Sequence, residues 1–151
     1  MNRNKGFTLI ELLVTIAIIS VLTSVVLLSL SSAKEKGIDS AVKSGLNQVR
    51  IQADLFYNYR GIYTGICDLA SDSTDPKGVN FLVLGSGKSN SIYTPVTVNG
   101  VGASTVRCNS SVSGWAAEVP LKNGIDFYCV DYTRQGIVTT TSIGNSYGYC
   151  R

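Results

Sequence analysis

An apolar run near the start of the chain, interrupted by one carboxylate, constrains the fold more than any other feature. Residues 7–30 read FTLIELLVTIAIISVLTSVVLLSL, with Glu11 as the one charged residue and no Pro or Gly. At about 1.5 Å per residue, a helix of this length measures about 36 Å, enough to cross a bilayer core of about 30 Å. Because a charge in hydrocarbon is costly, we expect Glu11 to have a partner.

Three ordinary explanations compete for this apolar run. Small residues at Ser31 and Ala33 suit a secretory signal peptide, but the apolar region of such a peptide is only about 7–15 residues long. A permanent membrane anchor fits the length but leaves Glu11 unexplained. A buried core helix would need a larger domain around it than a chain of 151 residues provides.

The charges that flank the run bear on membrane orientation. Arg3 and Lys5 precede it, and Lys34, Glu35 and Lys36 follow it. This distribution slightly favours a cytoplasmic N-terminus. The sequence therefore predicts a single pass through the cytoplasmic membrane, with the C-terminal part outside the cytoplasm.

Residues 31–60 continue the helical pattern but become amphipathic. Apolar side chains recur at steps of three or four residues, namely Ile38, Val42, Leu46, Val49, Ala53 and Phe56. This stripe predicts a helix that lies on a globular head, with Lys, Asp, Gln and Arg facing outward and Gly61 as its stop. Gly37 and Gly45 weaken the helix by about 1 kcal/mol each relative to Ala, so we expect bending or melting there.

Composition excludes several classes of function. The sequence has no His, which removes imidazole metal ligands and the His bases of Ser-His and Cys-His pairs, so we predict that the protein is not an enzyme. Formal net charge is +3, and it is +1 once Arg3 and Lys5 are set aside. That charge predicts no nucleic-acid partner.

Four cysteines, Cys67, Cys108, Cys129 and Cys150, lie in the C-terminal two thirds. Their even number and wide spacing, without a CxxC pair, predict disulfides in an oxidising compartment rather than a zinc site. Three connectivities are open. We favour Cys67 with Cys108 and Cys129 with Cys150, because neighbours in sequence close the shorter loops.

The part of the chain after residue 61 alternates short apolar runs with turn residues. VNFLVLG, residues 79–85, predicts a buried strand, and Asn99-Gly100 predicts a turn between two β-rich runs. The segment LVLGSGKSN, residues 82–90, lacks the first glycine of a phosphate-binding loop and precedes a β-like segment, so we interpret it as a solvated turn.

Residues 114–141 predict an antiparallel meander. Trp115, Ala117, Val119 and Leu121 alternate toward one face, and Asn123-Gly124 predicts a type I′ turn. The returning strand would place Ile125, Phe127 and Cys129 on the inner face, and Gln135-Gly136 would begin a third strand. Pro120 predicts an edge strand or a bulge.

One loop in this part holds three hard oxygen ligands. Asp68, Asp72 and Asp75 lie in CDLASDSTDPKG and are candidate calcium ligands, although their spacing is not that of an EF-hand. Asx turns ahead of Pro76 are the commoner use of such residues. We therefore predict neither a metal nor a cofactor, and keep calcium as an alternative.

The N-terminal block KGFTLIELLV, residues 5–14, resembles the type IV pilin and type II secretion pseudopilin superfamily. The resemblance implies cleavage after Gly6 by a prepilin peptidase, N-methylation of Phe7 and polymerisation through the apolar helix. It also implies a partner for Glu11, the N-terminal amine of a neighbouring subunit. Many pilins have a proline at the position of Leu28; this chain has none before Pro76, which makes Gly37 the candidate for flexibility.

These features together predict an α+β protein: a long N-terminal helix, first membrane-spanning and then amphipathic, packed on a small antiparallel sheet with disulfides. We expect a leader at residues 1–6, an apolar helix at 7–30, an amphipathic helix at 31–60 and a β-rich head at 61–151. The predicted function is a structural subunit of an extracellular or periplasmic filament, with other pilin subunits and membrane lipid as partners. The alternative is a permanently anchored, adhesin-like binding module outside the cytoplasm.

Overall fold

The computed structural model describes residues 6–68, 79–92, 96–98, 106–133, 136–144 and 148–150. The chain forms two compact units, residues 1–36 and residues 37–151. Asp72 and Asp75, two of the candidate calcium ligands, and the predicted turn at Asn99-Gly100 lie outside the described residues.

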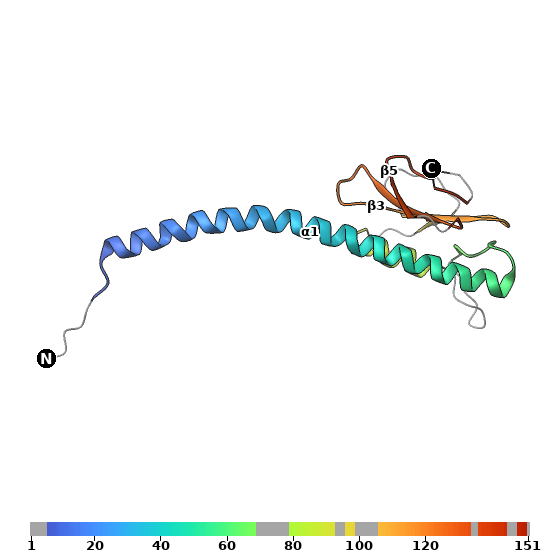
Figure 1. The fold of residues 1–151 in the computed structure, drawn as a ribbon, viewed down its shortest axis with the longest axis horizontal. Helices are drawn as coiled ribbons and strands as arrows, with labels where there is room; N and C mark the ends of the chain where they lie inside the picture. Colours follow the sequence, from blue (N-terminus) through green and yellow to red (C-terminus); the bar gives the residue numbers. More distant parts are fainter. Residues whose placement is uncertain are drawn as a thin grey trace. The chain divides into compact units, whose positions relative to one another are not determined.

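The described elements are two helices followed by five strands (Figure 1). In chain order they are α1 (Leu9–Arg60), α2 (Asn80–Ser89), β1 (Thr97–Val98), β2 (Arg107–Ser110), β3 (Trp115–Pro120), β4 (Phe127–Asp131) and β5 (Gly136–Thr139). The chain therefore has the predicted α+β class, with a long N-terminal helix and a small sheet.

The first unit contains the apolar turns of α1, whose side chains are exposed along its described length. Its hydroxyl groups bond within the helix: Thr15 Oγ1 donates to the Leu12 carbonyl at 2.8 Å, and Thr23 Oγ1 donates to the Ile19 carbonyl at 2.7 Å. Such local bonds would satisfy these hydroxyl groups in a membrane, where water is absent. By length and composition this helix qualifies to cross a membrane.

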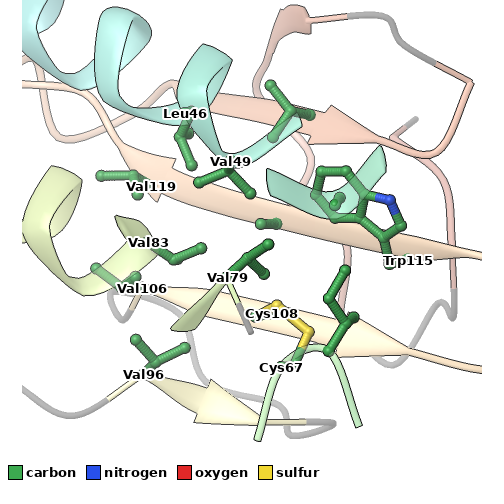
Figure 2. Packing of buried hydrophobic residues seen from close by; sticks show 14 of the residues in the cluster. Leu46, Val49, Cys67, Val79, Val83, Val96, Val106, Cys108, Trp115 and Val119 are labelled. Atoms are coloured by element: carbon green, nitrogen blue, oxygen red, sulfur yellow. A yellow bond between two sulfur atoms is a disulfide. The ribbon is translucent and has the colours of Figure 1, made fainter. Parts of the chain in front are cut away.

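The second unit has one main apolar core, to which α1 contributes the stripe that the sequence predicted (Figure 2). Five members of that stripe are buried in this core and Ile38 is half-buried; the five are Val42, Leu46, Val49, Ala53 and Phe56. The helix ends at Arg60, and Gly61 follows with a φ of +72°, a backbone conformation that suits glycine. The predicted stop is confirmed. Gly37 and Gly45 both lie within α1.

The strand predicted at residues 79–85 is wrong, because this segment begins helix α2. The buried residues of α2 are Asn80, Val83, Ser86 and Gly87, spaced three apart with one adjacent pair, as on one face of a helix. Gly87, Lys88 and Ser89 form its last turn, so the solvated turn expected there is also wrong.

Close packing explains the small residues that made this segment look like a strand and turn. A Cβ added at Gly87 would overlap Cγ2 of Val106, which is fully buried beside β2. A Cβ added at Gly45 would overlap the Ser86 hydroxyl, so Gly45 lets α1 approach α2. These glycines therefore serve contacts between elements, which local propensity does not reveal.

The five-stranded sheet has the order β1-β2-β3-β4-β5 and is mixed. β1 pairs with β2 in parallel, and the other three pairs are antiparallel, including the predicted meander β3-β4-β5. The expectation of a wholly antiparallel sheet is thus wrong.

The two faces of β4 are the reverse of the predicted ones. Tyr128 and Val130 lie in the main core, opposite Val119 and Ala117 of β3. Ile125 is exposed, Phe127 is half-buried and Cys129 belongs to a second small cluster with Ala116 and Ile143. The sheet is covered on both faces, so period-two alternation cannot reveal which face holds the core.

The connection between β3 and β4 also differs from the prediction. Gly124 has a φ of +73° but Asn123 has no positive φ, so the turn is not type I′. The Gly124 amide donates to the Leu121 carbonyl at 3.1 Å, and the Leu121 amide donates to the Asp126 carbonyl at 2.7 Å. Pro120 ends β3 two residues past Glu118, the last residue that pairs with β2, so in the described sheet it has a partner only on the β4 side, as at an edge. Its carbonyl accepts from Asn90 Nδ2 at 2.7 Å.

Two disulfides fasten the second unit, Cys67–Cys108 and Cys129–Cys150, with sequence separations of 41 and 21 residues. This is the pairing that the shorter loops favoured. Cys67 and Cys108 are fully buried in the main core, where the bond ties the segment after α1 to β2. Cys129 and Cys150 belong to the second cluster.

Candidate functional site

The residues just before α1 form a helix cap with Glu11. The Glu11 carboxylate accepts from the Thr8 amide at 2.9 Å and from Thr8 Oγ1 at 2.7 Å. In return, the Glu11 amide donates to Thr8 Oγ1 at 3.3 Å. This reciprocal arrangement is a capping box, in which a Thr and a Glu three residues later satisfy amides at the start of a helix.

Both Thr8 bonds reach the same carboxylate oxygen of Glu11. Each of them ends on Oε2. Within the described residues nothing else binds the Glu11 carboxylate, and its side chain is exposed. Glu11 thus has an intramolecular partner at one oxygen and an open position at the other.

The residues at the expected cleavage site are accessible. Gly6 is exposed, and the Phe7 side chain is 78 % exposed. A Cβ added at Gly6 would meet no atom within 4 Å, so no contact with the described residues requires glycine there.

The apolar surface that follows is too large to face water. The described large apolar side chains between Phe7 and Leu30 are each at least half exposed. A surface of this kind marks a contact with lipid or with other proteins. Glu11 lies near the start of this surface, where it is the one charge.

The amphipathic part of α1 exposes apolar residues that the sequence reasoning assigned to a polar face. Ile51, Leu55 and Tyr59 are exposed and follow one another at steps of four. Lys, Asp, Gln and Arg were expected to face outward here. The four-residue spacing of Ile51, Leu55 and Tyr59 indicates a second apolar stripe on this helix, which is shorter than the core stripe and was overlooked beside it.

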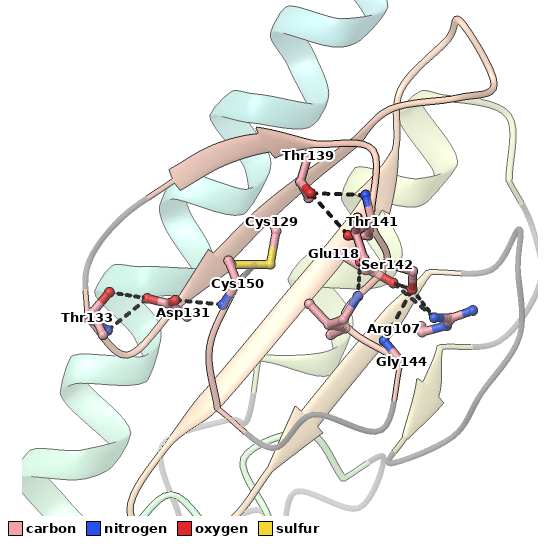
Figure 3. The surroundings of a disulfide bond; sticks show 11 residues. Arg107, Glu118, Cys129, Asp131, Thr133, Thr139, Thr141, Ser142, Gly144 and Cys150 are labelled. Carbon is pink, nitrogen blue, oxygen red and sulfur yellow. Dashed lines mark hydrogen bonds and ion pairs between the residues drawn. A yellow bond between two sulfur atoms is a disulfide. The ribbon is translucent and has the colours of Figure 1, made fainter.

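A buried ion pair joins two strands of the head (Figure 3). Arg107 Nη1 donates to Glu118 Oε1 at 3.2 Å, and the two residues face each other across β2 and β3. Glu118 Oε1 also accepts from the Ser142 hydroxyl, and Oε2 accepts from the Ile143 amide at 2.9 Å. Burial raises the pKa of Glu118, while the hydrogen bonds from Ser142 and Ile143 and the positive charge of Arg107 oppose that rise.

Asp131 and a disulfide hold the last described residues on the sheet. One oxygen of Asp131 accepts from the Thr133 amide at 2.9 Å and from the Thr133 hydroxyl at 2.6 Å. The other accepts from the Cys150 amide at 2.8 Å, next to the Cys129–Cys150 bond. These contacts and those of Glu118 stabilise the head, and the sequence analysis did not predict them. The available sequence signal was Glu118, a charged residue in the otherwise apolar strand β3.

Of the three candidate metal ligands, the described residues include only Asp68. Asp68 is exposed, and its amide donates to the Gly65 carbonyl at 3.1 Å. Across the described ranges, no group of three or more Cys, Asp or Glu side chains is arranged to hold a metal ion.

Part of the chain is similar to known proteins and to a known N-terminal motif. Residues 1–27 match the family model of the prokaryotic N-terminal methylation motif. The chain is 35% identical over 88 residues to the type IV wide pilus major component PilA4 of Thermus thermophilus. That alignment covers 56% of this chain and 66% of the relative, just under two thirds of its length. No solved structure matches the chain.

Proposed function

We propose that this type IV pilin-like chain is a structural subunit of a type IV pilus-like or type II secretion-like filament. The observation that carries the proposal is the methylation motif over residues 1–27, which coincides with an exposed apolar helix and its one carboxylate. Similarity to a pilus component in Thermus thermophilus supports it.

In this proposal the chain is processed before it assembles. A prepilin peptidase cuts after Gly6, which removes residues 1–6 and leaves Phe7 with a new N-terminal amine that is then methylated. The exposure of Gly6 and Phe7 is consistent with access by such an enzyme. The mature chain then has an apolar helix at residues 7–30, an amphipathic helix at 31–60 and a head at 61–151.

The apolar helix has two successive environments. It first anchors the subunit as a single pass through the cytoplasmic membrane, with the head outside the cytoplasm. It then packs against the helices of other subunits in an extracellular or periplasmic filament. Five of its hydroxyls suit both environments, because they bond to carbonyls of their own helix and need no water; they belong to Thr15, Ser20, Thr23, Ser24 and Ser29.

Glu11 sets the register between subunits. In the filament its carboxylate pairs with the methylated amine of Phe7 in a neighbouring copy. Since cleavage creates that amine, the pair forms only after processing. Desolvation of the two charges offsets much of their attraction, so the correct pair adds little net stability. A wrongly staggered neighbour leaves the Glu11 carboxylate buried without its counter-charge, and that cost is much larger than the net gain from the correct pair.

The head supplies surface rather than chemistry. Its buried charged groups, Arg107, Glu118 and Asp131, hold strands and the C-terminal segment together. Pilins are structural proteins, so we assign this chain no enzymatic activity and no nucleic-acid partner.

Processing is the experiment that tests the proposal. The full chain is expressed with a prepilin peptidase, and intact mass with N-terminal fragmentation is measured. We expect loss of residues 1–6 and one methyl group on Phe7. If a known prepilin is cut under the same conditions while this chain keeps its leader, the protein is instead a permanently anchored binding module.

A further inference from the structure

The outer edge of strand β5 is open among the described residues. In the sheet order β1-β2-β3-β4-β5, β5 is the last strand and pairs with β4 alone. We propose that this edge pairs in antiparallel fashion with the same edge of a second copy, and so joins subunits of two filaments side by side. The inference rests on the proposed function and adds to it a surface for contacts between filaments.

The backbone of β5 is paired on one side. Its four residues, Gly136–Thr139, form an antiparallel ladder with residues 127–130 of β4. β4 is also the one helix or strand of the described chain that β5 contacts extensively. Amide and carbonyl groups on the other side of β5 therefore have no strand to bond within the described residues, and such an edge is a template for pairing with another chain.

This edge lacks the features that commonly keep an edge strand from pairing. Natural edge strands are protected by charged side chains, by proline or by a bulge. Residues 135–150 contain no charged residue and no proline, and the ladder with β4 runs without a bulge. Ile137, Val138 and Thr139 are β-branched, which favours the extended conformation that a further strand would bind.

β5 is ordered before any partner binds. Ile137 packs against the second cluster of the head. At the end of the strand, Thr139 Oγ1 donates to the Thr141 carbonyl at 3.2 Å and accepts from the Thr141 amide at 3.0 Å (Figure 3). Because the strand is already held in place, it loses little conformational entropy on pairing. The edge therefore suits strand addition, in which main-chain hydrogen bonds hold the partner.

Charge and symmetry favour a second copy as the occupant. Two identical edges repel each other when they carry like charges, and this uncharged edge has no such repulsion. Antiparallel pairing of β5 with itself is a two-fold contact, which closes after two subunits and does not propagate along a filament. It therefore links one subunit in each of two filaments.

The size of the contact suits filaments rather than free subunits. A strand of four residues offers much less than the about 1,000 Å² that a stable interface between two proteins buries. A filament presents the same edge on every subunit, so many weak contacts act together. We therefore expect bundles of filaments and no dimer of free subunits.

The experiment compares two valine-to-lysine variants in sheared filaments. Val138→Lys places a charge on the edge strand, where Val138 is 50 % exposed. Val112→Lys is the matched control, because Val112 is 65 % exposed and lies between β2 and β3. Low-speed centrifugation at about 0.15 M salt pellets bundles but not single filaments, and a Debye length of about 8 Å screens charges far from the contact. We expect wild-type and Val112→Lys filaments in the pellet, and on the order of tenfold less Val138→Lys there.

Hydrogen exchange locates the contact. We expect the outward amides of β5 to exchange on the order of tenfold more slowly in wild-type bundles than in single Val138→Lys filaments. Amides of residues 111–114 should exchange at the same rate in both. Thermal unfolding confirms that the head of each variant is folded.

Several outcomes would overturn the pairing of β5. These are wild-type filaments that stay single, Val138→Lys filaments that bundle like the wild type, and bundles in which the β5 amides exchange freely. An equal loss of bundling in both variants would show a general effect of added charge and would also overturn it.

Processing and filament yield separate this inference from the proposed function. Intact mass and the yield of filaments are measured before bundling is compared. A chain that keeps its leader and forms no filaments overturns the proposed function and this inference with it. Processed wild-type subunits that form only single filaments overturn the pairing of β5 alone.

Discussion

Glu11 and Glu118 each lie in an otherwise apolar run of sequence, and the two carboxylates are satisfied in different ways. Glu11 is capped by Thr8 and leaves one oxygen open. Glu118 is fully buried and is bound by Arg107, Ser142 and Ile143. The Glu11 carboxylate can therefore bind a partner outside the chain, whereas the Glu118 carboxylate stabilises the head.

The buried pair predicts a large cost when one partner is removed. Arg107→Met leaves the Glu118 carboxylate buried without its counter-charge, and we expect a loss of about 3–5 kcal/mol in the free energy of unfolding. Urea titration followed by the fluorescence of Trp115, the single tryptophan, measures it. Lys122→Met, at an exposed residue, is the control, with a change within about 0.5 kcal/mol. Equal stability of the two variants would contradict the structural role of the pair.

The raised pKa of Glu118 predicts how this contribution varies with pH. In the window above its ordinary pKa of 4.5, the native state binds the proton more tightly than the unfolded state does. Stability from Glu118 therefore falls as pH rises through that window. We expect the unfolding free energy of the wild type, minus that of Glu118→Gln, to decrease from about pH 4 upward. An increase over that range would mean that the native-state pKa is lowered instead.

At the level of elements, the sequence predicted what periodicity controls and missed what tertiary packing controls. The core stripe of α1 and its end at Arg60 followed from spacing and from Gly61. Helix α2 did not, because Gly85 and Gly87 suggest turns, whereas Gly87 in fact allows a close contact with Val106. The parallel pairing of β1 and the covered second face of the sheet are non-local, and no short segment encodes them.

Two glycines of α2 provide a matched test of this explanation. A Cβ at Gly87 overlaps buried Val106, so we expect Gly87→Ala to destabilise the head by about 1–3 kcal/mol. A Cβ at Gly85 meets nothing within 4 Å, so Gly85→Ala should stabilise the helix by up to about 1 kcal/mol. Thermal unfolding compares the two variants. Adding Val106→Ala should recover part of the loss in Gly87→Ala; equal effects of the two glycine variants would contradict close packing.

The candidate site was only partly predictable. Gly6, Phe7 and Glu11 were recognised from a short block of sequence, and their roles in processing and assembly remain predictions. The capping box of Thr8 and Glu11 was missed, although a Thr followed three residues later by a Glu is its known signature. The cost of the Glu11 charge in lipid had directed the prediction to a partner in another subunit, whereas Thr8 of the same chain also binds it.

In the whole molecule, the two units have different roles in the proposed function. The described apolar residues of the first unit are exposed and form no core among themselves, so they require lipid or other helices around them. Residues 37–151 have a core, a sheet and two disulfides, so this unit has what a stable fold outside the cytoplasm requires. A chain built in this way suits a subunit that leaves the membrane to join a filament.

The most direct test of this proposal is the distance between Glu11 and the neighbouring N-terminal amines in filaments assembled from this chain. A helical reconstruction at side-chain resolution measures it. We predict that the Glu11 carboxylate lies within hydrogen-bond distance of the Phe7 amine of an adjacent copy, with the Thr8 bonds intact. A Glu11 carboxylate that contacts only its own chain, with every neighbouring amine beyond that distance, would contradict the central claim.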